Sequence, residues 1–92
     1  MEPPALLDLM AELAEEAGLR VRVMPRGAAP EGELLPGTGV CRVRDQIWVV
    51  LSPGDPVEDR IDALAAALRD HAKPFLEDRF VPPAVRERID RL

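Results

Sequence analysis

The sequence predicts an α+β fold in which a small, three-stranded, mainly antiparallel sheet packs with helices in the order α-β-β-β-α-α. Two observations support this prediction. Apolar residues recur at helical spacing near the amino terminus and in the second half of the chain, and three short strand-like segments lie between these regions. The length of 92 residues suits one domain and 47% of the residues are hydrophobic, so we expect residues 1–92 to fold as a single unit.

The first predicted elements are a helix over residues 4–17 and a strand over residues 19–24. Apolar residues line one face of the helix, and acidic residues occupy the other face, which we interpret as solvent-facing charge. Gly18 suits the left-handed conformation that ends many helices. The strand alternates apolar and basic residues, so Arg20 and Arg22 should share one side of it.

Residues 40–43 and 47–51 are predicted to form the next two strands as a hairpin. If the apolar residues of both strands face one core, Cys41 points inward. A two-residue turn would break this arrangement, whereas a three-residue connection preserves it by pairing Val43 with Ile47. We therefore predict the three-residue connection.

Two helices are predicted in the remainder of the chain. Asp55 is expected to cap the first of them, with Pro56 at its first position, and the helix should run to about Lys73. Pro74 is expected to end it, because proline cannot continue a helix interior. The pair Pro82-Pro83 then opens a short final helix.

The chain offers few groups for catalysis or metal binding. Its single cysteine, Cys41, can form neither an internal disulfide nor a Cys-x-x-Cys site. Its single histidine, His71, would need carboxylates such as Asp70 or Glu77 to converge on it, and no spacing demands this. We therefore expect no catalytic residue, no metal and no cofactor. An alternative stays open, because residues 25–37 contain three prolines and three glycines and could form a lid over Cys41 or His71 in a ligand-binding or enzymatic protein.

Charge and hydropathy exclude other classes. The net charge of −5 argues against nucleic-acid binding, so a nucleic-acid regulator is the third alternative, after an interaction domain and a ligand-binding or enzymatic protein. The apolar run over residues 47–51 is far shorter than the roughly 20 residues that span a bilayer. The acidic amino-terminal residues differ from a secretory signal, so we expect a cytoplasmic protein. The excess of arginine over lysine and the absence of Asn and Tyr suggest a GC-rich bacterial gene.

Strand alternation places several arginines beside the single tryptophan. The candidate partner-binding residues on this predicted face are Arg20, Arg22, Arg42, Trp48 and Val50. Arginine and tryptophan are enriched among interface anchors, so our leading interpretation is a non-catalytic interaction domain that binds another protein or a second copy of itself. The alternative is a solvated sheet face on which Arg42 stacks over Trp48.

The segment from Gly39 to His71 resembles the strand–hairpin–helix portion of the ImmA/IrrE type of zinc metallopeptidase. In that family a strand pair precedes a helix that carries His-Glu-x-x-His. The similar segment covers about a third of the 92 residues. Ala66, Ala67 and Asp70 stand where the motif has its first histidine, its glutamate and its second histidine. The resemblance therefore implies the scaffold without its zinc ligands, its base or its peptidase chemistry.

Overall fold

The computed structural model describes residues 1–25 and 37–92. Within these residues the chain forms a three-stranded sheet and four helices, which confirms the predicted α+β class. The elements in chain order are α1 (Pro3–Glu16), β1 (Arg20–Val23), β2 (Gly39–Val43), β3 (Gln46–Leu51), α2 (Val57–His71), α3 (Lys73–Glu77) and α4 (Pro83–Asp90).

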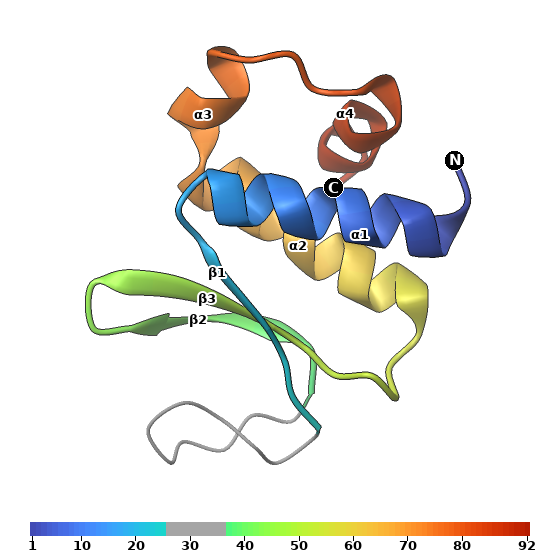
Figure 1. Cartoon of the computed structure of the whole chain (residues 1–92), viewed down its shortest axis with the longest axis vertical. Coiled ribbons are helices and arrows are strands. Elements are labelled where there is room, and N and C mark those ends of the chain that lie inside the picture. Colours follow the sequence, from blue (N-terminus) through green and yellow to red (C-terminus); the bar gives the residue numbers. More distant parts are fainter. Residues whose placement is uncertain (26–36) are drawn as a thin grey trace.

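The elements are arranged in layers (Figure 1). α1 and α2 lie side by side across one face of the sheet, and α3 and α4 lie on the other side of this helix pair. All four described helices are therefore on one side of the sheet. The helix pair occupies the middle of the molecule, which explains why α1 and α2 supply half of the buried hydrophobic side chains of the described residues.

α1 forms because its apolar residues repeat every three or four positions. Leu6, Met10 and Leu13 are buried, and the acidic residues between them are exposed, as the predicted amphipathic pattern requires. Gly18 has a φ of 95°, a conformation that favours glycine, and it turns the chain from α1 into β1. Leu19, directly after this turn, is buried in the core.

α2 supplies the apolar stripe opposite α1. Ile61, Leu64 and Leu68 are fully buried at helical spacing, and the small side chain of Ala65 is also buried. The helix begins at Val57 with Pro56 in the capping position, one residue later than the sequence predicted. Further core residues come from β3, from α3 and α4 and from the segment between these two helices: Val49, Leu51, Leu76, Val81, Val85 and Ile89.

The sheet is mixed, with β3 in the centre. β1 pairs with β3 in parallel, with Arg20 opposite Trp48 and Arg22 opposite Val50. β2 pairs with β3 in the antiparallel direction. The expectation of a mainly antiparallel sheet is thus met by one strand pair and not by the other.

The predicted hairpin register is wrong by one residue. Val43 pairs with Gln46 and Arg42 with Ile47, so the connection has two residues and begins at Arg44, whose φ is 57°. Two-residue hairpins need a positive φ in the turn because this matches the twist of the flanking strands. The prediction failed because it required the apolar residues of both strands to face one core, whereas Cys41 lies opposite Trp48, on the side away from the helices.

The carboxy-terminal part contains one helix more than predicted. α2 ends at His71, and Pro74 lies in the first turn of α3, where a missing N–H group costs little. α4 is attached to α2 through the Arg88 guanidinium, whose two terminal nitrogens donate to the Glu58 carboxylate at 2.6 and 3.2 Å. This hydrogen-bonded ion pair lowers the pKa of Glu58 below its ordinary value.

Replacement of two glycines by alanine should change stability in opposite directions. A methyl group at Gly18 or Gly54 would meet no atom within 4 Å, so any difference must come from the backbone. Gly18→Ala forces a positive φ on a chiral residue and should lower the free energy of unfolding by about 1 kcal/mol. Gly54, whose φ is not positive, should tolerate alanine and gain about 0.4–1 kcal/mol through reduced unfolded-state entropy. Urea unfolding measures both, and equal changes would contradict this explanation.

The Glu58–Arg88 contact should make stability depend on pH. Because the folded-state pKa of Glu58 is lowered, the contact contributes stability above the unfolded-state pKa, about 4.3, and loses it as the pH falls through the folded-state value. The free energy of unfolding, measured with urea at each pH, should therefore be lower for Glu58→Gln than for the original chain at pH 7. The difference between the two chains should be smaller at pH 3. Glu2→Gln, at an exposed position outside this contact, serves as the control. A gap of the same size at both pH values would contradict the assignment.

Candidate functional site

Two arginines and the tryptophan meet on the side of the sheet that faces away from the helices. β1 carries Arg20 and Arg22 to this side, and the parallel register brings them next to Trp48 on β3. The guanidinium carbon of Arg22 lies 5.2 Å from the centre of the Trp48 ring, within the range of a cation–π interaction. We call Arg20, Arg22 and Trp48 the arginine–tryptophan face.

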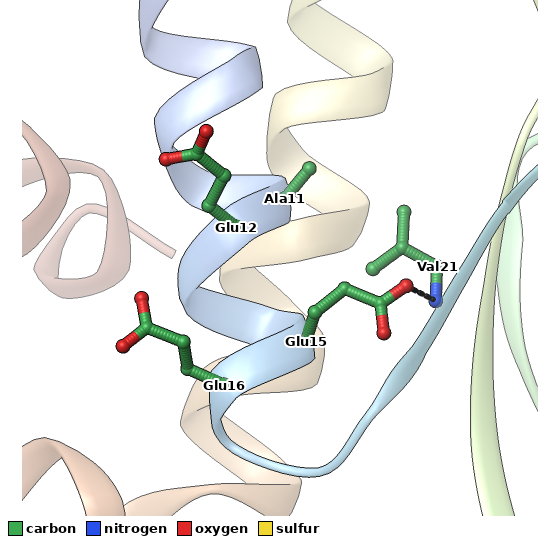
Figure 2. A pocket seen from close by; sticks show the side chains of 5 residues that line it. All are labelled: Ala11, Glu12, Glu15, Glu16 and Val21. Atoms are coloured by element: carbon green, nitrogen blue, oxygen red, sulfur yellow. Dashed lines mark hydrogen bonds between the residues drawn. The ribbon is translucent and has the colours of Figure 1, made fainter.

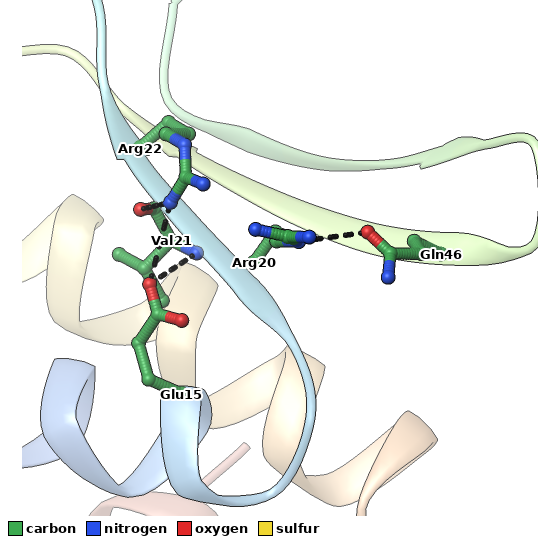
Figure 3. Close-up of polar contacts among 5 residues, drawn as sticks. All are labelled: Glu15, Arg20, Val21, Arg22 and Gln46. Atoms are coloured by element: carbon green, nitrogen blue, oxygen red, sulfur yellow. Dashed lines mark hydrogen bonds and ion pairs between the residues drawn. The ribbon is translucent and has the colours of Figure 1, made fainter.

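Arg20 is the most accessible cation of this face. Its side chain is exposed, and its Nε donates a hydrogen bond of 2.8 Å to Oε1 of Gln46 (Figure 3). Among the described residues no carboxylate lies within ion-pair distance of Arg20, so its terminal nitrogens can bind an acidic group. Gln46 was missed in the sequence because its position next to Arg20 depends on the parallel register of β1 with β3.

Two other residues that the sequence predicted for this face, Arg42 and Val50, do not contribute accessible surface to it. Arg42 pairs with Ile47 and therefore lies on the opposite side of the sheet, so its predicted place on this face is wrong, as is the alternative in which it stacks on Trp48. Val50 lies on the predicted side but is only 1% exposed, which leaves it no surface for a partner. Cys41 replaces Arg42 as the neighbour of Trp48 and is half-buried.

The free edge of β1 is covered by two side chains. Oε1 of Glu15 accepts hydrogen bonds from the Val21 N–H at 3.2 Å and from Nη1 of Arg22 at 3.4 Å, and the same nitrogen donates to the Val21 carbonyl at 2.8 Å (Figure 3). We call this arrangement of Glu15, Val21 and Arg22 the Glu15 clasp. The acidic face of α1 is predicted from the sequence to be solvent-facing charge, but Glu15 of that face binds the neighbouring strand β1.

A shallow groove lies between α1 and β1, next to the clasp (Figure 2). It has a volume of about 510 Å³ and is lined by Ala11, Glu12, Glu15, Glu16 and Val21. Glu16 is paired with Nη1 of Arg79 at 2.7 Å, whereas Glu12 has no polar partner among the described residues. The groove therefore combines small apolar side chains with three carboxylates. We call it the α1–β1 groove.

A second candidate site lies among α2, α3 and α4. This cation pocket has a volume of about 220 Å³ and is lined by Arg69, Lys73, Leu76, Glu77, Arg86 and Ile89. Arg69 donates to the neighbouring Asp70 at 2.8 and 3.2 Å, which lowers the pKa of that carboxyl. Lys73 and Arg86 have no ion-pair partner among the described residues, so the pocket has cationic groups available for an anion.

The small polar residues at the sheet end have a structural role. The Asp55 carboxylate accepts a hydrogen bond of 2.9 Å from the Thr38 N–H, and the Thr38 hydroxyl accepts one of 3.0 Å from the Ser52 N–H. Ser52 and Asp55 are buried, so these bonds satisfy polar groups that burial removes from water. They attach the start of β2 to the connection between β3 and α2.

The remaining candidates are not assembled into a site. His71 is exposed at the end of α2, and the described residues contain no group of three His, Cys, Asp or Glu side chains that could hold a metal ion. The proposed lid, residues 25–37, lies mostly outside the described residues, because the structure does not describe residues 26–36. No helix in the described part of the chain is long and apolar enough to cross a membrane.

Comparisons with known proteins do not assign the chain to a family. The chain matches no protein-family model, and neither a curated protein nor a solved structure is significantly similar to it. The resemblance of Gly39–His71 to the zinc metallopeptidases therefore stays a prediction. The candidate binding sites are therefore the arginine–tryptophan face, the α1–β1 groove and the cation pocket.

Proposed function

We propose that this chain is a non-catalytic protein-interaction domain, and that its arginine–tryptophan face binds an acidic segment of a partner protein. One observation carries the proposal: the exposed Arg20 guanidinium has no acidic partner among the described residues and lies beside Arg22 and Trp48. A cytoplasmic location, a bacterial source and the metallopeptidase-like scaffold belong to the same proposal as expectations from the sequence.

The chemistry of the face favours recognition of carboxylates. A guanidinium donates paired, charge-assisted hydrogen bonds to a carboxylate, and such bonds are stronger than those between neutral groups. The indole of Trp48 adds a flat apolar surface next to these donors. Neither group exchanges protons readily at neutral pH, so the face supports binding rather than acid–base catalysis.

The overall negative charge of the chain restricts binding of an acidic partner to the arginine–tryptophan face. The chain has a net charge of −5, whereas the arginine–tryptophan face carries two cations, of which only Arg22 is paired with a carboxylate of the described residues. An acidic partner is therefore repelled by the molecule as a whole and attracted only at this face. The same net charge disfavours a nucleic-acid partner, which needs an extended basic surface.

A matched pair of arginine variants tests the proposal. Trp48 is the only tryptophan, so its fluorescence reports directly on the face. Titration with the peptide Glu-Thr-Glu-Thr-Glu should change the Trp48 emission, and Arg20→Gln should weaken binding about tenfold, because hydrogen bonds to a charged group are lost. Arg42→Gln removes the same charge on the opposite side of the sheet and should leave the affinity unchanged. Equal weakening by both variants would show a general charge effect and refute the proposed site.

A second candidate function, the binding of a small anion, is favoured by the cation pocket. Lys73 and Arg86 could hold a carboxylate or phosphate group, and the buried side chains of Leu76 and Ile89 form an apolar wall for the rest of the molecule. This proposal keeps the ligand-binding alternative but does not use the loop over residues 25–37.

Thermal unfolding with two probes tests the anion site. Benzoate or inorganic phosphate at millimolar concentration should raise the melting temperature, because a ligand that binds only the folded state stabilises it. Lys73→Gln and Arg86→Gln should each reduce this shift. Arg91→Gln, which removes a cation paired with Glu87 outside the pocket, should leave the shift unchanged. A shift that neither pocket variant reduces would rule out this site.

A further inference from the structure

β1 is an edge strand of the described sheet, and the main-chain N–H and C=O groups on its outer side pair with no other described strand. In the sheet order β1-β3-β2, β1 has a single neighbour among the described strands, and Val21 directs its N–H and C=O groups to the other edge, where Glu15 and Arg22 occupy them. The two-residue period of a strand directs the main chain of Val23 to the same edge. Val23 is 68% exposed, and its main chain has no partner at this edge among the described residues.

Two of the three bonds of the clasp over this edge are long. Glu15 Oε1 accepts from the Val21 N–H at 3.2 Å and from Nη1 of Arg22 at 3.4 Å, longer than the usual 2.9–3.0 Å, whereas the bond from Nη1 of Arg22 to the Val21 carbonyl measures 2.8 Å. The side chains of Arg22 and Glu15 are 37% and 47% exposed, so water can replace their contacts. A strand that approaches the edge can therefore displace the clasp and bond the same main-chain groups.

The two sides of this edge carry opposite charge. On the side away from the helices are Arg20 and Arg22, and on the helix side is the α1–β1 groove with its three carboxylates (Figures 2 and 3). Successive side chains of an extended segment point to opposite faces of a sheet. A segment paired with β1 would thus present every second side chain to the arginines and the others to the glutamates.

We propose that the β1 edge binds an extended segment of a partner protein, in which an acidic, a basic and an acidic residue follow one another, as a fourth, antiparallel strand. This inference rests on the proposed function and specifies its binding mode. The basic residue lies opposite Val21 and exchanges two main-chain hydrogen bonds with it, as residues of a hydrogen-bonded antiparallel pair do. Its side chain faces the α1–β1 groove, and the two acidic side chains face Arg20 and Arg22.

A second copy of the chain does not fit this edge. Antiparallel pairing of two β1 strands about a two-fold axis would place the arginines of both copies side by side on one face and the α1 glutamates of both on the other. Like charges directly opposite each other destabilise strand pairs. The charges therefore select a different partner whose sequence complements both faces.

Peptides of defined order test the inference. Thr-Glu-Lys-Glu-Thr should bind with a change in Trp48 fluorescence, and Thr-Glu-Glu-Lys-Thr, with the same composition, should bind about tenfold more weakly. Methylation of the lysine main-chain nitrogen removes a bond to Val21 and should cost about five- to tenfold, the effect of losing one hydrogen bond. Methylation of the second glutamate nitrogen, which points away from β1, is the control and should have little effect.

Variants of Val21 test the same hydrogen bonds without chemical modification of the peptide. Val21→Pro removes the edge N–H but no hydrogen bond to β3, and edge strands tolerate proline when this group faces solvent. It should abolish the preference for Glu-Lys-Glu order, whereas Val21→Thr should retain it. Should Val21→Pro fail to fold, the methylated peptides decide the question on the original chain.

The outcomes separate this inference from the proposed function. If acidic peptides bind in an Arg20-dependent way but residue order and main-chain methylation have no effect, the strand mode is wrong and the interaction face stands. If no acidic peptide changes the Trp48 emission, the proposed function itself fails. Sedimentation should show a monomer, and a dimer that the peptide dissociates would assign the edge to a second copy and overturn the inference.

Discussion

The position of β3 between two strands and beneath the helix pair determines the rest of the structure. β3 is the one described strand with a neighbour on each side, and its side chains Val49 and Leu51 enter the helical core. Trp48, between apolar residues of the same strand, must then point away from the helices. Pairing in parallel with β3 brings the arginines of β1 to that side and leaves β1 at the edge of the sheet. The candidate site is thus a consequence of how β3 is buried.

Local patterns were sufficient to predict most elements. The apolar periodicity identified α1 and α2, and the alternating residues of β1 correctly placed Arg20 and Arg22 on one side. The hairpin register was wrong because apolar residues lie on both sides of its strands, so polarity alone could not select between two turn lengths. The turn also requires a positive φ at Arg44. Glycine, asparagine or aspartate at that position would have indicated such a turn, but arginine does not.

The candidate site was only partly predictable for a related reason. Arg20, Arg22 and Trp48 could be grouped by alternation, but the parallel direction of β1 is set by tertiary packing, and Gln46 and Glu15 join the site through contacts that no local pattern encodes. Glu15 also belongs to an acidic helix face that looks uniform in sequence. Only its contact with β1 distinguishes it from the neighbouring glutamates, of which one pairs with Arg79 instead.

The parallel pairing of β1 with β3 also bears on how the molecule folds. β2 and β3 are joined by a two-residue turn and can pair by a local closure, whereas β1 and β3 are farther apart in the sequence, so their pairing closes a larger loop. We expect α1 and β1 to dock after the hairpin and α2 have formed. Because β1 has a single neighbour among the described strands, its amide protons should also exchange with solvent more readily than those of β3. We therefore expect that the strand proposed to bind a partner at its edge is also the last of the three described strands to take its place in the sheet.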